Sequence, residues 1–152
     1  MKLYLVQHGE ARPEREDPER SLTDFGRDEI QRVSRVAKLM GVLPAVVYHS
    51  GKRRARQTAE ILGEALNLPL KQEEGLNPND PIQPWVERIS RERRDLMIVG
   101  HLPFLDHLAS FLICGNEKAR VILFRYGAIV CLEQKEDQGW AIRWVLSPEM
   151  IP

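Results

Sequence analysis

Three short apolar runs, each followed by a segment with helical periodicity, constrain the fold of this chain most strongly. The runs occupy residues 2–7, 45–49 and 95–100, and each has the length of a buried strand. A shorter strand is expected at residues 69–74. Strands that alternate with helices in this way form a mainly parallel sheet, because each helix returns the chain to the start of the next strand. The sequence therefore predicts a three-layer α/β fold with helices on both faces of the sheet.

Four helices are expected between and after these strands. Thr23 can cap a first helix that begins one residue later and is ended by Gly41. Ser50 can cap a second helix over residues 52–66, and Pro103 suits the first turn of the fourth. The apolar residues that mark the buried faces are Ile30, Val33, Ala37 and Met40 in the first helix, Ala55, Ala59, Leu62 and Leu66 in the second, and Ile82, Trp85, Val86 and Ile89 in the third.

The C-terminal part of the chain has a different pattern. Strand-like runs at residues 120–127, 128–134 and 140–146 are separated by Gly127 and by a polar turn. In the last run, alternate side chains are expected to share one face of the sheet: Trp140, Ile142, Trp144 and Leu146. The sheet is therefore expected to be mixed, with at least one antiparallel strand added by this part of the chain.

Length and composition limit the class of protein. With 152 residues the chain suits one domain, residues 1–152, with a sizeable core. The 22 Lys and Arg residues balance the 22 Asp and Glu residues, whereas a protein that binds nucleic acid is normally basic. No apolar run is long enough for a membrane span. Cys114 and Cys131 lie among apolar residues, so we expect buried thiols, no disulfide framework and a cytoplasmic location.

Histidines stand at the ends of the three long apolar runs, at the sheet edge where open α/β folds bind their ligands. The first run ends at His8, the second at His49 and the third just before His101. Arg53 and Arg54 follow the second run at the start of a predicted helix. Helix N-termini favour anions, and an arginine in the first turn can lean back over the strand ends and grip a phosphate. The combination indicates a phosphate site.

Each of these features alone has a simpler interpretation. A histidine at a strand end usually just closes the strand, and the basic run at residues 52–56 would usually be a solvated helix face. Only their combination at three parallel strand ends favours a site. No metal site is indicated, because His101 and His107 are six positions apart and do not share a helical face. His107 is therefore expected to be structural.

The strand ends resemble those of the histidine phosphatase superfamily, which has the phosphoglycerate mutase-like fold. The family begins with a strand ending in Arg-His-Gly, and residues 7–9 here read Gln-His-Gly. Residues 21–26 are similar to its Leu-Thr-x-x-Gly element, and residues 49–62 resemble its Ser-x-x-x-Arg-Ala-x-Gln-Thr element. Residues 98–103 resemble the element of its second histidine. The short chain looks most like the SixA-type phosphohistidine phosphatases.

This resemblance implies a role for each motif residue. His8 would be the nucleophile that carries a covalent phosphoryl group, and Arg54 and His101 would act in catalysis by stabilising the transition state. The residues expected to bind phosphate are Gln7, Gly9, Arg20, Arg54 and His101. No cofactor or metal is implied. The candidates for a general acid are Glu73, Glu74 and Asp80, or there is none, which a phosphohistidine substrate tolerates.

The implied activity is removal of phosphate from phosphohistidine on signalling proteins. The implied partners are the phosphoprotein, phosphate and other oxyanions, and neither nucleic acid nor membrane. Gln7 is the one core position that departs from the family pattern, because the family has a charged arginine there. The alternatives are therefore a phosphatase for small phosphomonoesters and a weakly active module that binds phosphate or phosphoproteins.

Overall fold

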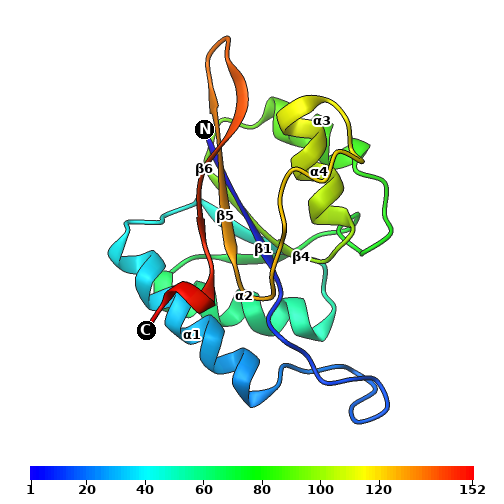
Figure 1. Ribbon diagram of the computed structural model, residues 1–152, viewed down its shortest axis with the longest axis vertical. Coiled ribbons are helices and arrows are strands. Elements are labelled where there is room, and N and C mark those ends of the chain that lie inside the picture. Colours follow the sequence, from blue (N-terminus) through cyan, green and yellow to red (C-terminus); the bar gives the residue numbers. More distant parts are fainter.

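The computed structural model describes residues 1–152 and alternates strands with helices before it ends in a hairpin. The elements are β1 (Lys2–Gln7), α1 (Asp24–Leu39), β2 (Val46–His49), α2 (Arg53–Leu66), β3 (Leu70–Gln72), α3 (Gln83–Arg91), β4 (Leu96–Gly100), α4 (Phe104–Cys114), β5 (Ile129–Lys135), β6 (Gly139–Leu146) and the short η1 (Pro148–Met150). Helices α1 and α2 lie on one side of the sheet, and α3 and α4 lie on the other (Figure 1). The predicted three-layer α/β fold is confirmed.

The order of the strands places three strand ends side by side. The six-stranded sheet has the order β3-β2-β4-β1-β5-β6. Strands β1 to β4 are parallel, and β5 and β6 form the antiparallel extension that the sequence predicted. Gln7 of β1 is in register with Gly100 of β4, and His49 of β2 with Val99 of β4. The carboxyl ends of β2, β4 and β1 are therefore neighbours at one sheet edge.

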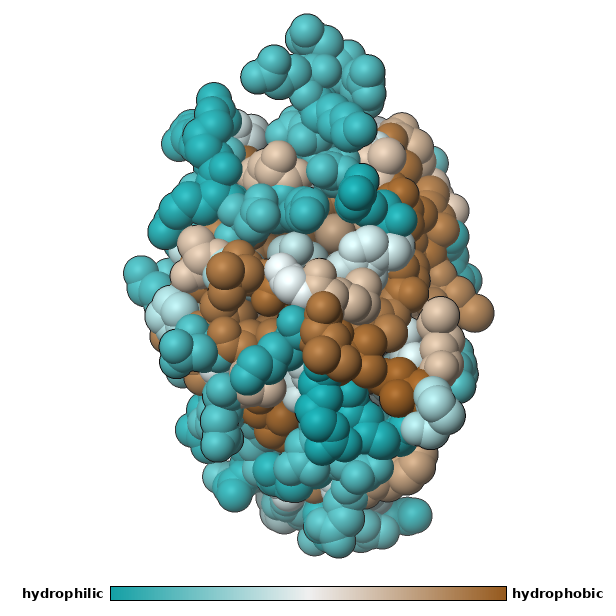
Figure 2. All heavy atoms as spheres, turned by 90° about the vertical axis from the view of Figure 1, so that its left-hand side faces the viewer, coloured by the Kyte–Doolittle hydropathy of each residue, from teal (hydrophilic) through white to brown (hydrophobic).

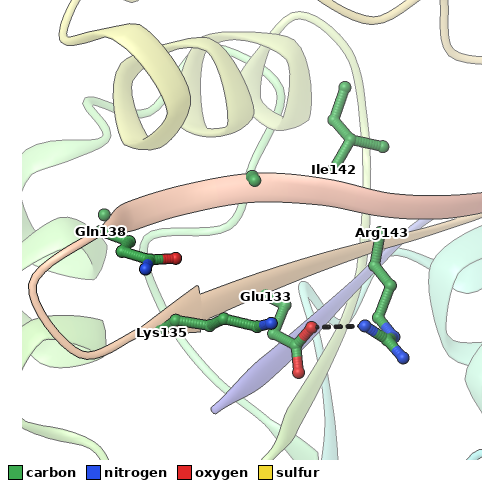
Figure 3. Close-up of a pocket in the computed structure, with 7 residues that line it drawn as sticks. Glu133, Lys135, Gln138, Ile142 and Arg143 are labelled. Atoms are coloured by element: carbon green, nitrogen blue, oxygen red, sulfur yellow. Dashed lines mark hydrogen bonds and ion pairs between the residues drawn. The ribbon is translucent and has the colours of Figure 1, made fainter.

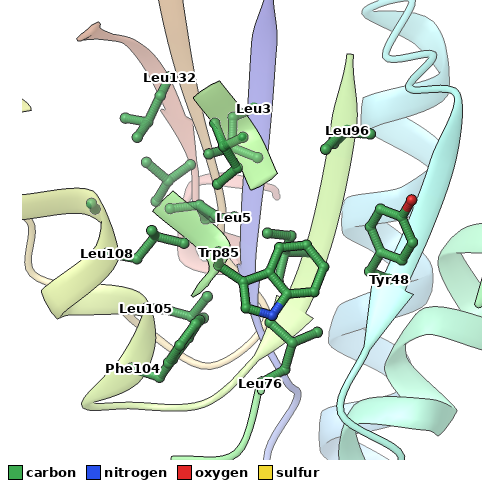
Figure 4. Packing of buried hydrophobic residues seen from close by; sticks show 14 of the residues in the cluster. Leu3, Leu5, Tyr48, Leu76, Trp85, Leu96, Phe104, Leu105, Leu108 and Leu132 are labelled. Carbon is green, nitrogen blue, oxygen red and sulfur yellow. The ribbon is translucent and has the colours of Figure 1, made fainter. Parts of the chain in front are cut away.

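The two faces of β1 build two separate cores. Leu3 and Leu5 pack in the core with α3 and α4, whereas Tyr4 and Val6 pack in the core with α1 and α2. Figure 4 shows the first core, in which Trp85 of α3 lies against the leucines of the sheet. Because both faces of β1 are covered, the residues that follow this strand have a fixed position relative to the helices.

The two helices that begin near the strand ends start differently. Thr23 caps α1 as predicted, since its Oγ1 accepts a hydrogen bond from the backbone N–H of Gly26 at 2.9 Å. The predicted cap of α2 is wrong, because Lys52 occupies the N-cap position and its side chain makes no capping hydrogen bond. Gly51, with a φ of 90°, turns the chain between Ser50 and the helix. The Ser50 Oγ accepts a hydrogen bond from the backbone N–H of Lys52 at 3.3 Å and also lies 2.7 Å from His101 at the sheet edge.

Residues 120–127 were predicted to form a strand, but they form a loop. Both edges of β1 are already paired, with β4 and with β5, so the sheet has no place for a further strand beside it. Phe124 of this segment is buried, whereas Leu123 is 93% exposed. The backbone N–H of Gly127 donates to the carbonyl of Gln7 at 2.9 Å, which fixes the end of the loop next to the end of β1.

The prediction that alternate side chains of β6 share one face of the sheet is wrong, because the hairpin contains a β-bulge. The pairing of β6 with β5 slips by one residue at Arg143, between Ile142 and Trp144. The slip reverses the alternation of side chains. Trp140 therefore packs on the core with α3 and α4, and Trp144 on the core with α1 and α2.

Two expectations about burial are also wrong. Cys114 is exposed because it lies at the end of α4, whereas Cys131 in β5 is buried as predicted. Met40 is 47% exposed because α1 ends before it.

On the face shown in Figure 2, hydrophilic residues cover both ends and hydrophobic residues reach the surface across the middle. None of the helices combines the length and the apolar character that crossing a membrane requires.

Candidate active site

His8 directly follows β1 and is held in one tautomer. Its Nδ1 lies 2.7 Å from the carbonyl oxygen of Gly9. Because a carbonyl can only accept a hydrogen bond, Nδ1 carries the ring proton. Nε2 therefore has a free lone pair, and the Nε–H of Arg54 donates to it at 3.3 Å. A neutral imidazole with an unprotonated nitrogen is the nucleophilic form of histidine.

Thr58 connects the chain after His8 to the helix that carries Arg54. The N–H of Gly9 donates to the Thr58 Oγ1 at 3.0 Å, and this hydroxyl donates to the carbonyl of Arg54 at 2.8 Å. A Cβ on Gly9 would lie 3.1 Å from the Ile30 side chain, so Gly9 packs tightly against α1 and a larger residue would have to push Ile30 aside. Gly9 was expected to bind phosphate, but both its backbone polar groups are used in these contacts. Its place in the structure is behind His8, which it positions.

His101 lies beside His8 at the end of β4. The centroids of the two rings are 5.1 Å apart. The Nε2 of His101 is 2.7 Å from the Oγ of Ser50, and its Nδ1 is buried without a hydrogen-bond partner. The three parallel strands thus bring His8, His101, Ser50 and Arg54 together, as the arrangement of the strand ends predicted for the histidines and the arginine.

Burial keeps both histidines neutral in the free protein. Burial, helped by the nearby charges of Arg54 and Arg20 and partly opposed by the hydrogen bond to Gly9, lowers the pKa of His8 from 6.5 to about 4. Burial also lowers the pKa of His101 from 6.5 to about 3, with smaller effects from His8 and Arg54. A bound phosphate dianion would act in the opposite direction and favour the protonated form of His101.

Arg20 lies on a basic cavity next to the histidines. Its Nε donates to the carbonyl of Arg12 at 3.2 Å, and its charge lowers the pKa of both His8 and His101. The cavity has a volume of about 490 Å³. Its charged lining residues are Glu14, Glu19, Arg20, Lys52, Arg53, Arg54 and Arg56. The excess of cations over carboxylates gives this cavity the electrostatic character of an anion site.

Gln7 is the last residue of β1 and is only 7% exposed. Its backbone is held by pairing with β4 and by the hydrogen bond from Gly127. Its Oε1 is buried and has no hydrogen-bond partner. The side chain is therefore neutral and enclosed at the position where the family has a charged residue.

None of the three candidate acids shares a hydrogen bond or a cavity with His8. Glu73 forms ion pairs with Arg88 and Lys71, both at 3.2 Å, and the hydrogen bond from Arg88 lowers its pKa. Glu73 is therefore ionised and has no proton to donate at neutral pH. Asp80 accepts a hydrogen bond from the backbone of its own loop at 2.8 Å, and Glu74 follows β3 in the same region.

Three residues near the histidines were missed as site residues from the sequence. Ser50 contacts His101, and Thr58 lies one helical turn after Arg54, so its spacing could have marked it. The ring of Tyr126 lies 5.4 Å from that of His8. Tyr126 comes from the loop before β5, and no local pattern in the sequence places this loop beside β1.

No group of three or more His, Cys, Asp or Glu side chains is arranged to hold a metal ion. A separate polar pocket of about 340 Å³ lies on the β5–β6 hairpin and is shown in Figure 3. There, Glu133 and Arg143 form an ion pair at 2.9 Å, and no histidine lines the pocket. The histidines and the arginine that could act on a phosphoryl group therefore lie at the carboxyl ends of the parallel strands.

Comparison with known families identifies this arrangement. The model of the histidine phosphatase superfamily (branch 1) matches residues 3–81 of the chain. The chain belongs to the histidine phosphatase superfamily. The predicted enzyme class, a phosphatase of this superfamily, is thereby confirmed. The matched region of this chain contains His8, Arg20 and Arg54, whereas His101 lies beyond it.

Relatives of this histidine phosphatase match it over most of its length. The phosphohistidine phosphatase SixA of Escherichia coli K12 is 27% identical over 97% of this chain and 94% of its own. An uncharacterised protein of Picosynechococcus is 33% identical over 84% of this chain and 87% of its own. The predicted likeness to SixA-type proteins is confirmed.

Solved structures share the fold. A structure of the protein histidine phosphatase SixA complexed with tungstate superposes with a TM-score of 0.83, at 24% identity over 99% of each chain. The α-ribazole phosphatase of Shigella flexneri superposes with a TM-score of 0.79, at 16% identity over 97% of each chain. The same fold therefore occurs in phosphatases named for a protein substrate and for a small molecule.

Proposed function

We propose that this protein is a metal-independent phosphatase that removes phosphate from phosphohistidine on proteins. One observation carries the proposal: the Nδ1 proton of His8 is held by Gly9 while its free Nε2 faces Arg54. A nucleophile and a cation that suits phosphoryl oxygens thus meet at one point, with His101 beside them. The likeness to SixA over nearly the whole chain supports phosphohistidine as the substrate.

In the first step, the lone pair of His8 Nε2 attacks the phosphorus of the substrate. A new P–N bond forms to Nε2 while the P–N bond to the substrate imidazole breaks, and its electron pair stays on the departing nitrogen. Arg54 turns from Nε2 to the phosphoryl oxygens, and His101 and Arg20 stabilise the negative charge on them. Nδ1 keeps its proton, so the phosphorylated ring remains hydrogen-bonded to Gly9.

In the second step, water hydrolyses the phosphorylated His8. The water oxygen bonds to phosphorus, both water protons leave with the phosphate as H₂PO₄⁻, and the electrons of the P–N bond return to Nε2. His8 is thereby restored as a neutral imidazole with its proton on Nδ1. The hydrogen bond to Gly9 is the same at the start and at the end of the cycle, so no proton has to enter or leave Nδ1.

The leaving group supports phosphohistidine over a phosphomonoester. A substrate imidazole that is protonated on its other nitrogen departs as a neutral molecule, whereas a phosphomonoester releases an alkoxide that needs a proton. Glu73, one of the three predicted acids, is ionised beside Arg88. The reaction that fits these residues best is therefore the one that requires no enzymatic acid.

Gln7 favours a second candidate function, a module that binds phosphate or phosphoproteins with little turnover. Loss of one preorganised transition-state donor costs roughly 3–4 kcal/mol, or 100- to 1000-fold in rate. In our proposal Arg20 or Arg53, which both line the basic cavity, supplies charge that reduces this loss. A phosphatase for small phosphomonoesters is the alternative within the same superfamily.

A comparison of two substrates tests these functions. Wild type, His8→Ala and Gln7→Arg are offered a phosphohistidine protein and p-nitrophenyl phosphate, with and without EDTA. We expect wild type to prefer the phosphoprotein and to be unaffected by EDTA, His8→Ala to lose at least about 1000-fold in kcat, and Gln7→Arg to gain activity. If His8→Ala stays fully active, the nucleophile is wrong.

Other outcomes separate the alternatives. Faster turnover of p-nitrophenyl phosphate than of the phosphoprotein would favour the phosphomonoesterase. Binding of tungstate without turnover by both wild type and Gln7→Arg would favour the binding module. We further propose that the phosphoprotein belongs to a cytoplasmic signalling system, which agrees with the free thiols of Cys114 and Cys131.

A further inference from the structure

An apolar groove adjoins the candidate active site along the start of α4 and the loop before β5. Its volume is about 420 Å³, and its apolar lining residues are Leu102, Pro103, Ile122, Leu123 and Phe124. Leu102 directly follows His101 in the chain. The lining of the groove therefore begins at the residue that follows His101.

Several large hydrophobic side chains are exposed on this groove and on the loop that contributes to it. Leu123 is 93% exposed, and Leu102, Val121 and Tyr126 are each more than one third exposed. Single exposed leucines are ordinary, but an apolar cluster beside a reactive pocket is typical of a binding surface. Val121, Leu123 and Tyr126 belong to the run that was predicted as a strand from the sequence.

Three contacts fix the shape of the loop that carries Leu123. The N–H of Val121 donates to the Oγ of Ser110 at 3.3 Å, and Gly127 is bonded to the end of β1. Arg125 forms an ion pair with the buried Glu29 of α1 at 2.7 Å. The exposed side chains therefore stand on an anchored backbone, so binding requires little ordering of the loop.

We propose that this groove docks apolar side chains that lie next to the phosphohistidine on the protein substrate. The inference rests on the proposed function. The phosphoryl group sits at the end of one side chain, so the substrate backbone has to lie over the surface around the two histidines. Tyr126, beside His8, and Leu102, next to His101 in the chain, are both exposed there. The other side of the pocket carries Arg20 and Arg53. The matching substrate surface presents apolar side chains to the groove, whose lining also holds Asp106, Lys118 and Arg120, and acidic side chains to Arg20.

The test compares a protein substrate with a small one. Leu123→Ser is assayed with a ³²P-labelled histidine phosphotransfer protein and with phosphoimidazole, which carries the same P–N bond but no protein surface. Leu39→Ser is the control, because Leu39 is 87% exposed at the far end of α1. We expect kcat/KM of Leu123→Ser for the phosphoprotein to fall about tenfold or more, the equivalent of exposing one buried leucine. Its kcat/KM for phosphoimidazole should not change.

The other outcomes overturn the inference in distinguishable ways. Equal losses on both substrates would mean that Leu123 shapes the active site, and no loss would mean that the groove is not used. If wild type cleaves phosphoimidazole but not the phosphoprotein, the proposed function fails and the docking surface fails with it. If wild type sediments as a dimer that Leu123→Ser dissociates, the groove binds a second copy of the chain instead.

Discussion

The hydrogen bond between His8 and Gly9 shows how a backbone carbonyl selects the reactive atom of a side chain. The carbonyl fixes the proton on Nδ1 and leaves Nε2 facing Arg54. Thr58 and Ile30 hold Gly9 in turn, so the tautomer depends on the packing of two helices against the end of β1.

The buried histidines also make stability depend on pH. Between about pH 6.5 and pH 3, the unfolded chain binds a proton on His101 that the folded protein does not, so acid favours unfolding and stability rises with pH. Replacing His101 with Asn removes this effect. We expect wild type to lose about 2 kcal/mol more than His101→Asn between pH 7 and pH 5.

Urea denaturation at the two pH values, in buffer without phosphate, measures this difference. Phosphate is left out because a bound anion would favour the charged histidine. Equal losses in wild type and His101→Asn would show that His101 is not held neutral in the folded protein.

At the scale of elements, the start of α1 is fixed to the chain that leaves the active site. Thr23 caps the helix and also donates through its hydroxyl to the Glu10 carboxylate at 2.9 Å. A Cβ on Gly26 would lie 2.3 Å from the carbonyl oxygen of Glu10, so glycine permits this close approach. The first turn of α1 therefore supports the backbone two residues after His8.

Removing the cap should weaken this support. We expect Thr23→Ala to lower the free energy of unfolding by about 1 kcal/mol, because the N–H of Gly26 loses its acceptor. Lys52→Ala is the control, since Lys52 occupies the N-cap of α2 without a capping hydrogen bond. This control should change stability by less than about 0.5 kcal/mol. Equal effects in denaturant titrations would contradict the assigned cap.

At the scale of the whole molecule, one ion pair joins the layer of α1 to the loop that carries the apolar groove. Arg125 contacts Glu29 through two hydrogen bonds, at 2.7 and 3.3 Å, and this raises the pKa of the arginine. Glu29 is only 3% exposed. Its charge would be left buried without a partner if Arg125 were removed.

The cost of breaking this pair should exceed that of a surface pair. We expect Arg125→Ala to lower stability by about 3 kcal/mol. Arg143→Ala, which removes the more exposed pair with Glu133 on the hairpin, should cost less than about 1 kcal/mol (Figure 3). Thermal or urea unfolding of the two variants checks the ranking, and similar losses would refute it.

Much of the architecture could be predicted from the sequence, because its signals are local. Continuous apolar runs marked β1, β2 and β4, the period of 3.6 residues marked the helices, and Thr23 marked the start of α1. Failures occurred where a neighbour decides the outcome. Residues 120–127 have strand character, but both edges of the neighbouring β1 are already paired. One bulge at Arg143 sends Trp140 and Trp144 to opposite faces.

The sequence by itself determined which reactive residues stand at strand ends, because each of His8, Arg54 and His101 follows a local pattern at the end of a strand or the start of a helix. Only the tertiary structure decided what surrounds them. The strand order makes His8 and His101 neighbours, and the fold brings Ser50 and Tyr126 to their rings. These contacts join residues far apart in the chain, so no pattern of spacing encodes them.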